Sequence, residues 1–472
     1  MATRTVHQRR RLVALSLVII IAGSLVIALA YKKDDGRESR GPLPPKATRV
    51  LPPVDPLRYV ASRRADYERH AALGLSHVIY AKTPGGVIAS AQRTERFRSI
   101  YARVGAHHKL DPDTLAAIAM LESAGRPDAQ ASSDLSSAVG LTQILAETGQ
   151  NLLGLHIDVK QSERLTRGID RGSRVAARTQ KRMRIDERFD PAKAVEATAR
   201  YLDFAKSKLG GRTDLAVESY HMGVGNLQQA LGRYGKGDVP YAQLYFDSSP
   251  VRNFSAWRKL ASLGDDSSTY YWRVLAAKEI LRLYRNDPKA LSDLAELQSH
   301  KASSEEVLHP EATTPPYDDG SAIDDALDSG ELTALPVATL ARAGIRVDPG
   351  MGALAAKIDS KRSRYRALRP QALAVLEALG RGVRRISHER GALILTSSVR
   401  DRDYQQALLA SDAEATQAFS LHTTGWAFDL ARVYRSSAQS HALQFMLDRL
   451  AALGLVAWVR EPRAIHVTVA TR

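Results

Sequence analysis

The sequence contains no cysteine among its 472 residues. Without thiols the protein can form no disulfide framework, no thiol nucleophile, no thiolate metal site and no lipid anchor on cysteine. Aromatic residues make up only 6% of the chain, and no motif interleaves them with basic residues as nucleic-acid sites do. We therefore expect no nucleic acid among the partners of this protein.

Acidic residues are outnumbered by basic ones, 51 to 67, which gives a formal net charge of +16. This balance favours anionic partners, and with nucleic acid set aside these are an anionic polymer or an anionic membrane surface. The densest basic run extends from Lys160 to Arg184. Such a run is typical of a solvated surface, and contact with an anionic glycan is the alternative.

Long uncharged runs are also scarce, and the one that stands out extends from Leu12 to Ala30, after a short arginine-rich start. Its length is close to the about 20 apolar residues that span a bilayer. We expect a cytoplasmic tail over 1–11, a single transmembrane helix or signal anchor over 12–31, and a linker and helical stalk over 32–95. The cleavage-like Ala28-Leu29-Ala30 makes a removed signal peptide the alternative. The expected location is the cell membrane, single-pass, with the domains on the extracytoplasmic (periplasmic or cell-wall) side.

Residues 96–285 read as mostly helical, and one helix within them ends on a carboxylate. Asp111 is a good N-cap and Pro112 suits the first helical position, so a helix is expected from there to Glu122. The helix is apolar on all sides and is therefore expected to be buried. Burial raises the pKa of a carboxyl group, which makes Glu122 available as a general acid. An exposed Glu at a frayed helix end is the alternative.

Further motifs follow in a fixed order: Glu122-Ser123, Gly140-Leu-Thr-Gln-Ile144, Phe189-Asp190-Pro191, Ala216-Val-Glu-Ser-Tyr-His-Met-Gly223 and Tyr270-Tyr-Trp-Arg-Val274. This set resembles the soluble lytic transglycosylase family, whose lysozyme-like domain shows E-S, then G-L-M-Q-I, then A-Y-N-A-G. The chain departs from the family at His221 and Met222, where Asn and Ala are usual, and its basic stretch looks like an insertion.

The resemblance implies that Glu122 is the single catalytic acid/base. It would protonate the β-1,4 glycosidic oxygen between MurNAc and GlcNAc and then take a proton from the sugar's own 6-hydroxyl, giving a 1,6-anhydro product. Ser123, Gln143 and Tyr220 would bind the glycan. A hydrolytic muramidase, the rival activity, needs a second carboxylate. Candidates for that carboxylate are Asp134, Glu147 and Glu218.

The end of the chain differs from residues 96–285, because it has an acidic segment followed by a mixture of helices and strands. Residues 286–364 read as an acidic linker and connecting segment, and 365–472 mix helices with alternating strands, which predicts an α+β domain with an antiparallel sheet. Asp429 and His466 lie on these strands, and His422 lies seven residues before Asp429, across a glycine. The three are reasonable zinc ligands that leave a fourth position open.

This stretch resembles the zinc D-Ala-D-Ala carboxypeptidase group, whose pattern is S-x-H-x-x-G-x-A-x-D followed by a distal His. The resemblance implies a zinc cofactor for this second domain, none for the first, and an Arg400 that binds a peptide carboxylate. The group usually has an acid or a second His two or three residues before the last ligand, where this chain has Ala464 and Arg463. Glu461 lies five residues before it, so metal or peptide binding without cleavage is the alternative.

Together these features predict a multidomain protein with a single N-terminal transmembrane helix, a mostly α lysozyme-like domain and a C-terminal α+β zinc-peptidase-like domain. The expected partners are peptidoglycan glycan strands and stem peptides, and the membrane through the N-terminal helix. The expected function is a membrane-anchored lytic transglycosylase coupled to a domain that trims or holds stem peptides. A cell-wall binding or scaffold protein built from degenerate enzyme domains is the rival from another class.

Overall fold

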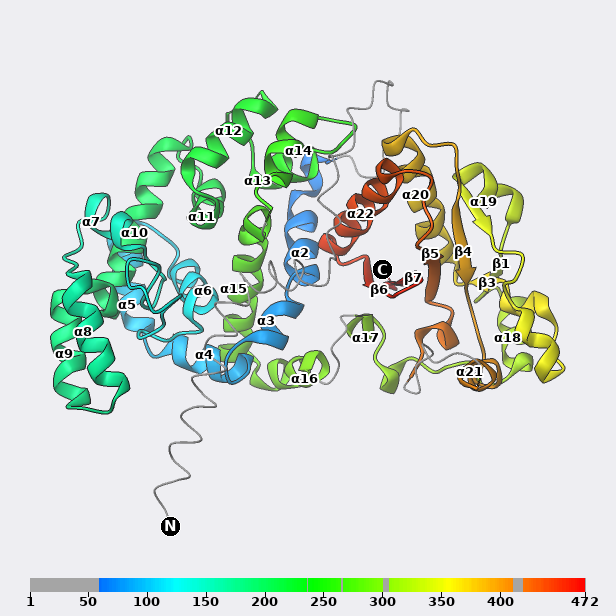
Figure 1. Ribbon diagram of the computed structural model, residues 1–472, viewed down its shortest axis with the longest axis horizontal. Helices are drawn as coiled ribbons and strands as arrows, with labels where there is room; N and C mark the ends of the chain where they lie inside the picture. Colours follow the sequence, from blue (N-terminus) through cyan, green and yellow to red (C-terminus); the bar gives the residue numbers. More distant parts are fainter. Residues whose placement is uncertain (1–58, 236, 265, 300–304, 411–418, 472) are drawn as a thin grey trace, which may run out of the picture. The chain divides into compact units, whose positions relative to one another are not determined.

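The computed structural model describes residues 59–235, 237–264, 266–299, 305–410 and 419–471 (Figure 1). These residues divide into two compact units, unit 1 with 59–249 and 255–296, and unit 2 with 250–254 and 297–471. The predicted tail and transmembrane segment, 1–11 and 12–31, lie outside the described residues. Among the helices that are described, none has both the length and the apolar character needed to cross a bilayer.

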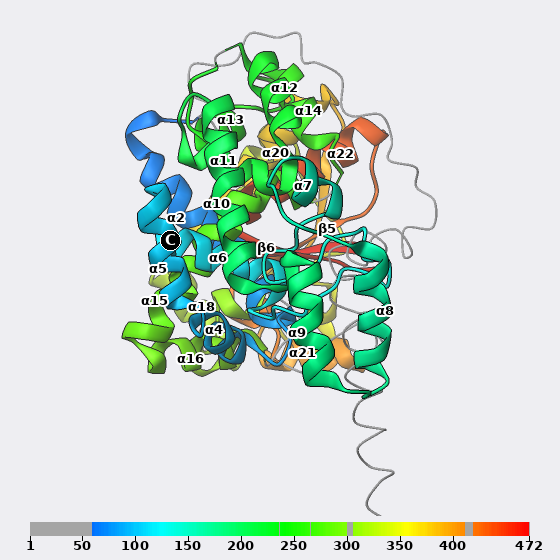
Figure 2. The same ribbon diagram turned by 90° about the vertical axis from the view of Figure 1, so that its left-hand side faces the viewer.

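Unit 1 is built from helices, seen in blue to green in Figure 1 and from its own side in Figure 2. They are α2 (Arg64–Gly74), α3 (His77–Lys82), α4 (Val87–Glu95), α5 (Arg98–His108), α6 (Pro112–Ser123), α7 (Ala146–Asn151), α8 (Val159–Asp170), α9 (Val175–Ile185), α10 (Pro191–Lys208), α11 (Thr213–Met222), α12 (Val224–Tyr234), α13 (Tyr241–Phe246), α14 (Phe254–Ala261), α15 (Tyr270–Asn286) and α16 (Pro288–Ser299).

Helix α6 is the central element of unit 1, packed against α4, α5, α10 and α15. Its residues from Thr114 to Met120 are all buried, as expected for a helix that is apolar on all sides. The side chain of Asp111 accepts a hydrogen bond from the N–H of Asp113, and Pro112 occupies the first turn. The prediction of this helix and its start is therefore confirmed.

The described part of the predicted stalk is not a separate spacer. Helices α2 and α4 pack on α15, and α4 also packs on α6. The guanidinium of Arg93 donates to the carbonyl of Ala124 over 2.9 Å. Gly125 has a φ of +74°, and a Cβ there would lie 2.5 Å from the backbone nitrogen of Thr94. Residues 59–95 thus support the end of α6, and the predicted boundary at residue 96 is corrected.

The loop between α6 and α7 is folded around a buried ion pair. Arg188 and Asp186 are both fully buried and joined by two nitrogen–oxygen contacts of 2.9 Å. The same guanidinium donates to three loop carbonyls, those of Leu135, Ser137 and Ile144. The five N–H donors of arginine suit this task, because one side chain can satisfy several buried acceptors in fixed directions.

Gly140 lies at the closest approach between this loop and the ion pair. Its φ is +85°, and a Cβ in its place would come 1.9 Å from the carbonyl oxygen of Arg188. Only glycine fits both the left-handed conformation and the contact. The first residue of the predicted Gly-Leu-Thr-Gln-Ile motif is therefore a packing requirement.

Unit 2 contains a five-stranded sheet with the order β2-β4-β5-β7-β6. Its strands are β2 (Ile345–Val347), β4 (Leu393–Ser397), β5 (Ala427–Ala431), β7 (Ala464–Val469) and β6 (Val456–Arg460). All neighbouring pairs are antiparallel except β2 with β4, which is parallel. Helices α20 (Pro370–Ser387) and α22 (Ser437–Ala452) pack on each other and on this sheet. The predicted α+β region with an antiparallel sheet is confirmed, with one parallel pair added.

The predicted acidic linker over 286–364 is corrected, because its described residues are folded. They include α17 (Glu305–Leu308), α18 (Gly320–Asp328), β1 (Thr333–Ala334), which pairs with β3 (Ala367–Leu368), and α19 (Val337–Ala343). Helix α18 is amphipathic although its sequence is rich in acidic residues. Ile323 and Ala326, three positions apart, are buried on one face. The helix also pairs Asp324 with Arg364. Unit 2 begins near residue 297 rather than at 365.

The buried ion pair yields a stability prediction. Arg188→Ala leaves the Asp186 carboxylate and three loop carbonyls buried without their donor. We expect it to lower the free energy of unfolding of unit 1 by about 3–5 kcal/mol, measured by chemical denaturation. The exposed Arg184 next to this segment provides the control, and Arg184→Ala should cost less than about 0.5 kcal/mol. Equal losses in the two variants would contradict this role of Arg188.

Candidate active site and candidate metal centre

Glu122 lies in the last turn of α6, facing the first residue of α15. The hydroxyl of Tyr270 donates a hydrogen bond to Glu122 Oε1 over 2.7 Å. Burial raises the pKa of the Glu122 carboxyl, while the charge of His221, the Tyr270 hydrogen bond and the charge of Arg273 act in the opposite direction. Burial dominates, so the group keeps its proton to a higher pH than an ordinary glutamate. A general acid needs this property.

Aromatic rings form a layer beside this carboxyl. The ring of Tyr270 lies parallel to that of Tyr220 at 6.2 Å and to that of His221 at 5.3 Å. The hydroxyl of Tyr220 donates to the carbonyl of Thr142 over 2.8 Å, which ties α11 to the motif loop. His221 is bound through Nδ1 to the hydroxyl of Ser267 at 2.8 Å. Where the family usually has Asn, His221 thus places an imidazole ring, which can carry a positive charge, beside Glu122.

Ser123 lies between α6 and the loop that carries the Gly-Leu-Thr-Gln-Ile motif. Its side chain is only 2% exposed, and its hydroxyl lies 2.7 Å from the carbonyl oxygen of Leu141 and 3.0 Å from that of Ala119, so its single proton is donated to one or shared between them. Ser123 therefore holds this loop against α6. Its contact with the glycan stays a prediction.

Gln143 lies in the same loop with a φ of +52°. Its amide nitrogen donates to the carbonyl of Gly140 over 2.9 Å and to that of Ala129 over 3.2 Å. These bonds support the loop, and the side chain is only half-buried. The contacts of Gln143 and Tyr220 with a glycan stay predictions.

The three candidates for a second catalytic carboxylate lie in other settings. Glu218 is fully buried and accepts a hydrogen bond from the N–H of Tyr271, while Asp134 and Glu147 are exposed. The acidic neighbour whose negative charge raises the pKa of Glu122 is Asp266. Its carboxylate forms an ion pair with Arg273.

Tyr270, Asp266 and Arg273 were not predicted as site residues. The segment from Tyr270 to Val274 resembles the closing segment of the family, and this resemblance is the one signal in the sequence that points to it. Its position 148 residues after Glu122 hides the contact from any local pattern. Only the packing of α15 on α6 brings them together.

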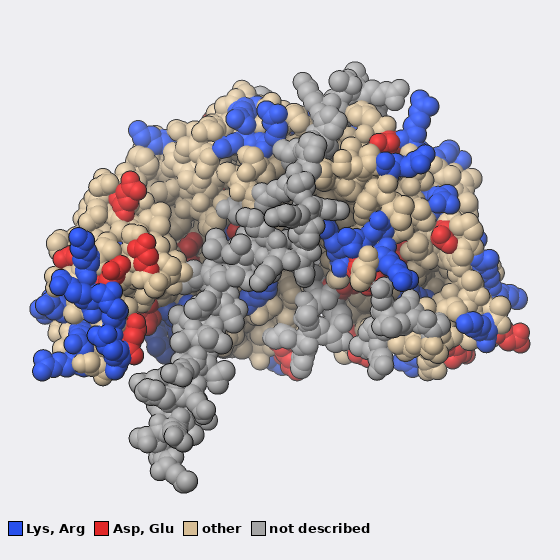
Figure 3. All heavy atoms as spheres, viewed as in Figure 1, with Lys and Arg blue, Asp and Glu red and all other residues tan. Residues whose placement is uncertain are grey.

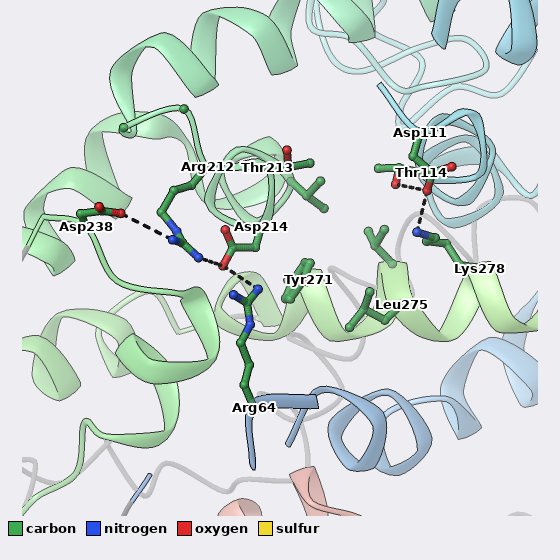
Figure 4. A pocket seen from close by; sticks show the side chains of 14 residues that line it. Arg64, Asp111, Thr114, Arg212, Thr213, Asp214, Asp238, Tyr271, Leu275 and Lys278 are labelled. Carbon is green, nitrogen blue, oxygen red and sulfur yellow. Dashed lines mark hydrogen bonds and ion pairs between the residues drawn. The ribbon is translucent and has the colours of Figure 1, made fainter. Parts of the chain in front are cut away.

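A separate polar cavity of about 590 Å³ lies beside α11 and α15 (Figure 4). Asp214 projects into it between two arginines, with contacts of 3.1 Å to Arg212 and 3.4 Å to Arg64. The carboxylate also accepts from the N–H of Tyr241 over 2.8 Å. On the opposite wall Lys278 pairs with Asp111 at 2.6 Å. These charges compensate one another and link helices, so the cavity holds a structural network.

A model of the family described as Transglycosylase SLT domain matches residues 101–166 and 171–240. This domain indicates a lytic transglycosylase enzyme. The match includes Glu122, the motif loop and Tyr220, and it ends before Tyr270. The two matched parts are separated by residues 167–170, at the end of α8. No residue of unit 2 is matched by the family model. A search of curated proteins finds none that matches the chain. The substrate implied by the domain is peptidoglycan.

Unit 2 brings the three predicted metal ligands together. Asp429 of β5 lies directly opposite His466 of β7 in the antiparallel register, and His422 lies in the short turn that precedes β5. One atom from each residue falls within 4.8 Å of the others. Asp429 Oδ1 is 2.8 Å from His466 Nδ1, and Oδ2 is 3.1 Å from His422 Nε2.

The remaining ring nitrogens are bound as they are in known metal sites. His422 Nδ1 lies 2.8 Å from the carbonyl oxygen of Ser398, and His466 Nε2 lies 2.7 Å from Glu305 Oε2. Carbonyl and carboxylate partners of this kind fix the tautomer and leave the other nitrogen free to bind a metal. The nitrogen and oxygen donors suit zinc, so the residues fit the group that the resemblance implies.

The pKa values of the two histidines differ, and each follows from its surroundings. Burial and the charge of Arg400 lower the pKa of His422 to about 4, so this ring is neutral. Although burial opposes it, the hydrogen bonds to Asp429 and Glu305 raise the pKa of His466 to about 10. In this state a protonated His466 supplies the positive charge that two buried carboxylates require.

Glu305 was missed because its segment read as a linker. It is buried, and Thr468 donates to its Oε2 over 2.9 Å, next to the bond from His466. The acidic composition around it concealed one buried carboxylate, and nothing in the local sequence distinguishes it from its neighbours.

Glu461 is the acidic residue that the strand register brings nearest to the position of the missing acid before His466. Val459 pairs with His466, and the N–H of Glu461 bonds to the carbonyl of Ala464, so the side chain of Glu461 shares a face with that of His466. Burial raises the pKa of Glu461, and so do the charges of Asp429 and Glu305. The carboxyl therefore lies near the cluster although it is five residues away in sequence.

Arg400 also belongs to the cluster. Its Nη2 donates to Ser397 Oγ over 2.7 Å and lies 3.5 Å from Asp429 Oδ2. Its Nη1 donates to Gln405 over 3.0 Å. Its predicted contact with a peptide carboxylate remains a prediction.

The Tyr270 bond generates a pH prediction. It stabilises the ionised form of Glu122, so Tyr270→Phe should raise the pKa of that carboxyl further. Because a general acid must be protonated, the alkaline limb of kcat/KM against pH should move to higher pH. Tyr284→Phe on the same helix is the control and should leave the limb in place. A shift of the Tyr270→Phe limb to lower pH would refute the assignment.

Proposed function

We propose that the enzyme cleaves the β-1,4 bond between MurNAc and GlcNAc with Glu122 as its only acid/base, and that the product carries a 1,6-anhydro ring. The observation that carries this proposal is a carboxyl group of raised pKa, bound by Tyr270, within a transglycosylase SLT domain. One carboxyl suffices when the nucleophile is a hydroxyl of the substrate itself, because no water has to be held and activated.

The carboxyl group of Glu122 transfers the proton in both steps. Its proton passes to the glycosidic oxygen as the bond to the sugar carbon breaks. The carboxylate that remains accepts the hydrogen bond from Tyr270, and then takes the proton of the 6-hydroxyl as that oxygen bonds to the same carbon. Glu122 ends protonated, ready for the next cycle.

Replacement of Glu122 tests this function. We expect Glu122→Gln to reduce the release of anhydro-muropeptides from purified peptidoglycan by about 10²–10⁴-fold, measured by mass spectrometry. Glu147→Gln, an exposed carboxylate of the same domain, is the matched control and should retain activity. Products with reducing ends from the wild type would favour the muramidase, and an inactive wild type would favour the scaffold protein.

For the N-terminus we propose a single-pass anchor over 12–31, which would hold both units on the extracytoplasmic side. The support is the sequence alone: the uncharged run is close to the about 20 residues that a bilayer requires. Fractionation of cells that express the full chain, compared with a chain that begins at residue 32, tests it. Equal release of both proteins into the soluble fraction would refute the anchor.

For unit 2 we propose a zinc site that acts on or binds stem peptides. His422 Nε2, His466 Nδ1 and a carboxylate oxygen of Asp429 would hold the ion, and bound zinc supplies Lewis acidity and a more acidic water. Glu305 and the Ser398 carbonyl orient the two rings. Glu461 could take up a proton on its carboxyl, and Arg400 would pair with the peptide carboxylate.

Metal analysis tests the zinc site directly. Wild type should bind one equivalent of zinc more than His422→Ala, measured by elemental analysis after dialysis. His388→Asn removes an exposed histidine of the same unit and should keep the zinc. Glu461→Gln should also keep the zinc but lose any peptide hydrolysis. No difference in zinc content between wild type and His422→Ala would refute the site.

A further inference from the structure

The basic run between Lys160 and Arg184 forms a helical hairpin. Helices α8 and α9 pack along each other, and the hairpin is closed at its base by a bridge between Ile157 and Asp186. The N–H of Asp158 also bonds to the carbonyl of Ile185 over 2.8 Å. Figure 3 shows Lys and Arg side chains crowded at the left edge, where Figure 1 places α8 and α9.

Two of the arginines serve the hairpin itself. Arg182 is buried, donates to the hydroxyl of Thr166 over 2.9 Å and lies 3.9 Å from the ring centre of Phe189. Arg178 donates to the carbonyls of Gly168 and Ser173. These two side chains fill the contact between the helices and are not available to a partner.

The other cations of the run are exposed: Lys160, Arg164, Arg167, Arg171, Arg174, Lys181 and Arg184. Lys160, Arg164 and Arg167 of α8, and Arg171 directly after its last residue, recur at the spacing of one helix face. The opposite face carries Ser162 and Thr166, which are buried. The outer side of α8 is therefore a continuous basic stripe, in which the Cβ atoms of neighbouring cations are about 5–6 Å apart.

Acidic residues leave most of this charge uncompensated. Glu163 contacts Arg167 at 3.8 Å, and Asp158 caps the start of α8. Within the described parts of the chain, the remaining exposed cations of the hairpin form no ion pair. A rigid surface that keeps this much like charge in one place is suited to a partner with repeated negative groups.

The make-up of the hairpin limits the class of partner. Its helices contain no aromatic residue on which nucleic-acid bases could stack. The face of α8 that packs in the hairpin carries Ser162, Thr166 and Gly168, and the apolar side chains of Leu165 and Ile169 are half-buried. The helix therefore has no fully exposed apolar face to enter a membrane interface as a lipid-bound amphipathic helix does. Guanidinium groups bind carboxylates through two parallel hydrogen bonds, and arginine predominates on this surface.

We infer that the α8–α9 hairpin binds the carboxylates of peptidoglycan stem peptides and thereby holds the enzyme on its polymer. This inference rests on the proposed function for the identity of the polymer. The hairpin is continuous with the catalytic region, because Asp186 and Arg188, which follow α9, hold the loop beside Glu122. Many weak contacts on one rigid body increase retention without a deep pocket.

Retention on insoluble peptidoglycan tests the hairpin separately from catalysis. The full-length protein carries Glu122→Gln to prevent digestion, and binding is measured by co-sedimentation at several salt concentrations. We expect Lys160→Gln, Arg164→Gln and Arg171→Gln together to weaken binding about tenfold at low salt and to reduce its salt dependence. Arg103→Gln, Lys208→Gln and Arg233→Gln remove three exposed cations from α5, α10 and α12 as the matched control, and should leave binding near that of the parent.

Two further arms identify the ligand. Binding should fall to the level of the hairpin variant when an amidase has stripped the stem peptides from the glycan. Vesicles of anionic phospholipid should not retain the parent better than the hairpin variant. Equal binding by parent and hairpin variant, equal losses in hairpin variant and control, unchanged binding to stripped glycan, or hairpin-dependent binding to the vesicles would each overturn the inference.

The folded state and the activity are checked independently. If thermal melting shows that the triple variant is unfolded, the pair Lys160→Gln and Arg164→Gln takes its place, with an expected loss of about fivefold. In the background with Glu122 intact, the hairpin variant should still release 1,6-anhydro disaccharides from peptide-free glycan fragments at the wild-type rate. Failure of the proposed function would show there, as missing anhydro products in the wild type, whereas the hairpin inference depends on retention alone.

Discussion

The ion pair between Asp186 and Arg188 is the contact on which the active region depends. Both side chains are fully buried, and the arginine alone satisfies carbonyls at three points of the loop between α6 and α7. That loop is the partner of Ser123 and Tyr220, which flank Glu122 and Tyr270 in the structure. A buried ion pair is costly to desolvate, and it is stabilising only when every remaining donor finds an acceptor, as here.

The two units use buried carboxylates in opposite ways. In unit 1, burial raises the pKa of Glu122, whose hydrogen-bond partner is the neutral hydroxyl of Tyr270. In unit 2, Asp429 is also buried, but contacts from His422 and His466 hold its pKa well below the usual range. The first arrangement suits a group that gives up a proton and recovers it. The second suits a permanent negative charge, such as a metal ligand provides.

Local patterns in the sequence predict individual helices and strands, but they do not predict which side chains come into contact across long stretches of the chain. The cap at Asp111, the apolar surface of α6 and the alternation of β5 and β7 predicted these elements correctly, because each depends on neighbours along the chain. Tyr270 and Glu305 reach their partners across more than a hundred residues, so no local spacing reveals them. The acidic segment before residue 335 misled for a related reason, since composition alone does not show that Ile323 and Leu332 are buried together.

The pairing of β5 with β7 has a consequence for how unit 2 tolerates change. Successive side chains of a strand point to opposite faces, so one residue inserted in β7 between Ala464 and His466 would turn the imidazole to the other side of the sheet. Backbone bonds could re-form one position along, but the histidine–aspartate pair would be lost. The same shift would move the side chains of Val467 and Val469 away from the buried face of the sheet. The register of β7 therefore ties the cluster to the core of unit 2, and an insertion of odd length in this strand would disturb both.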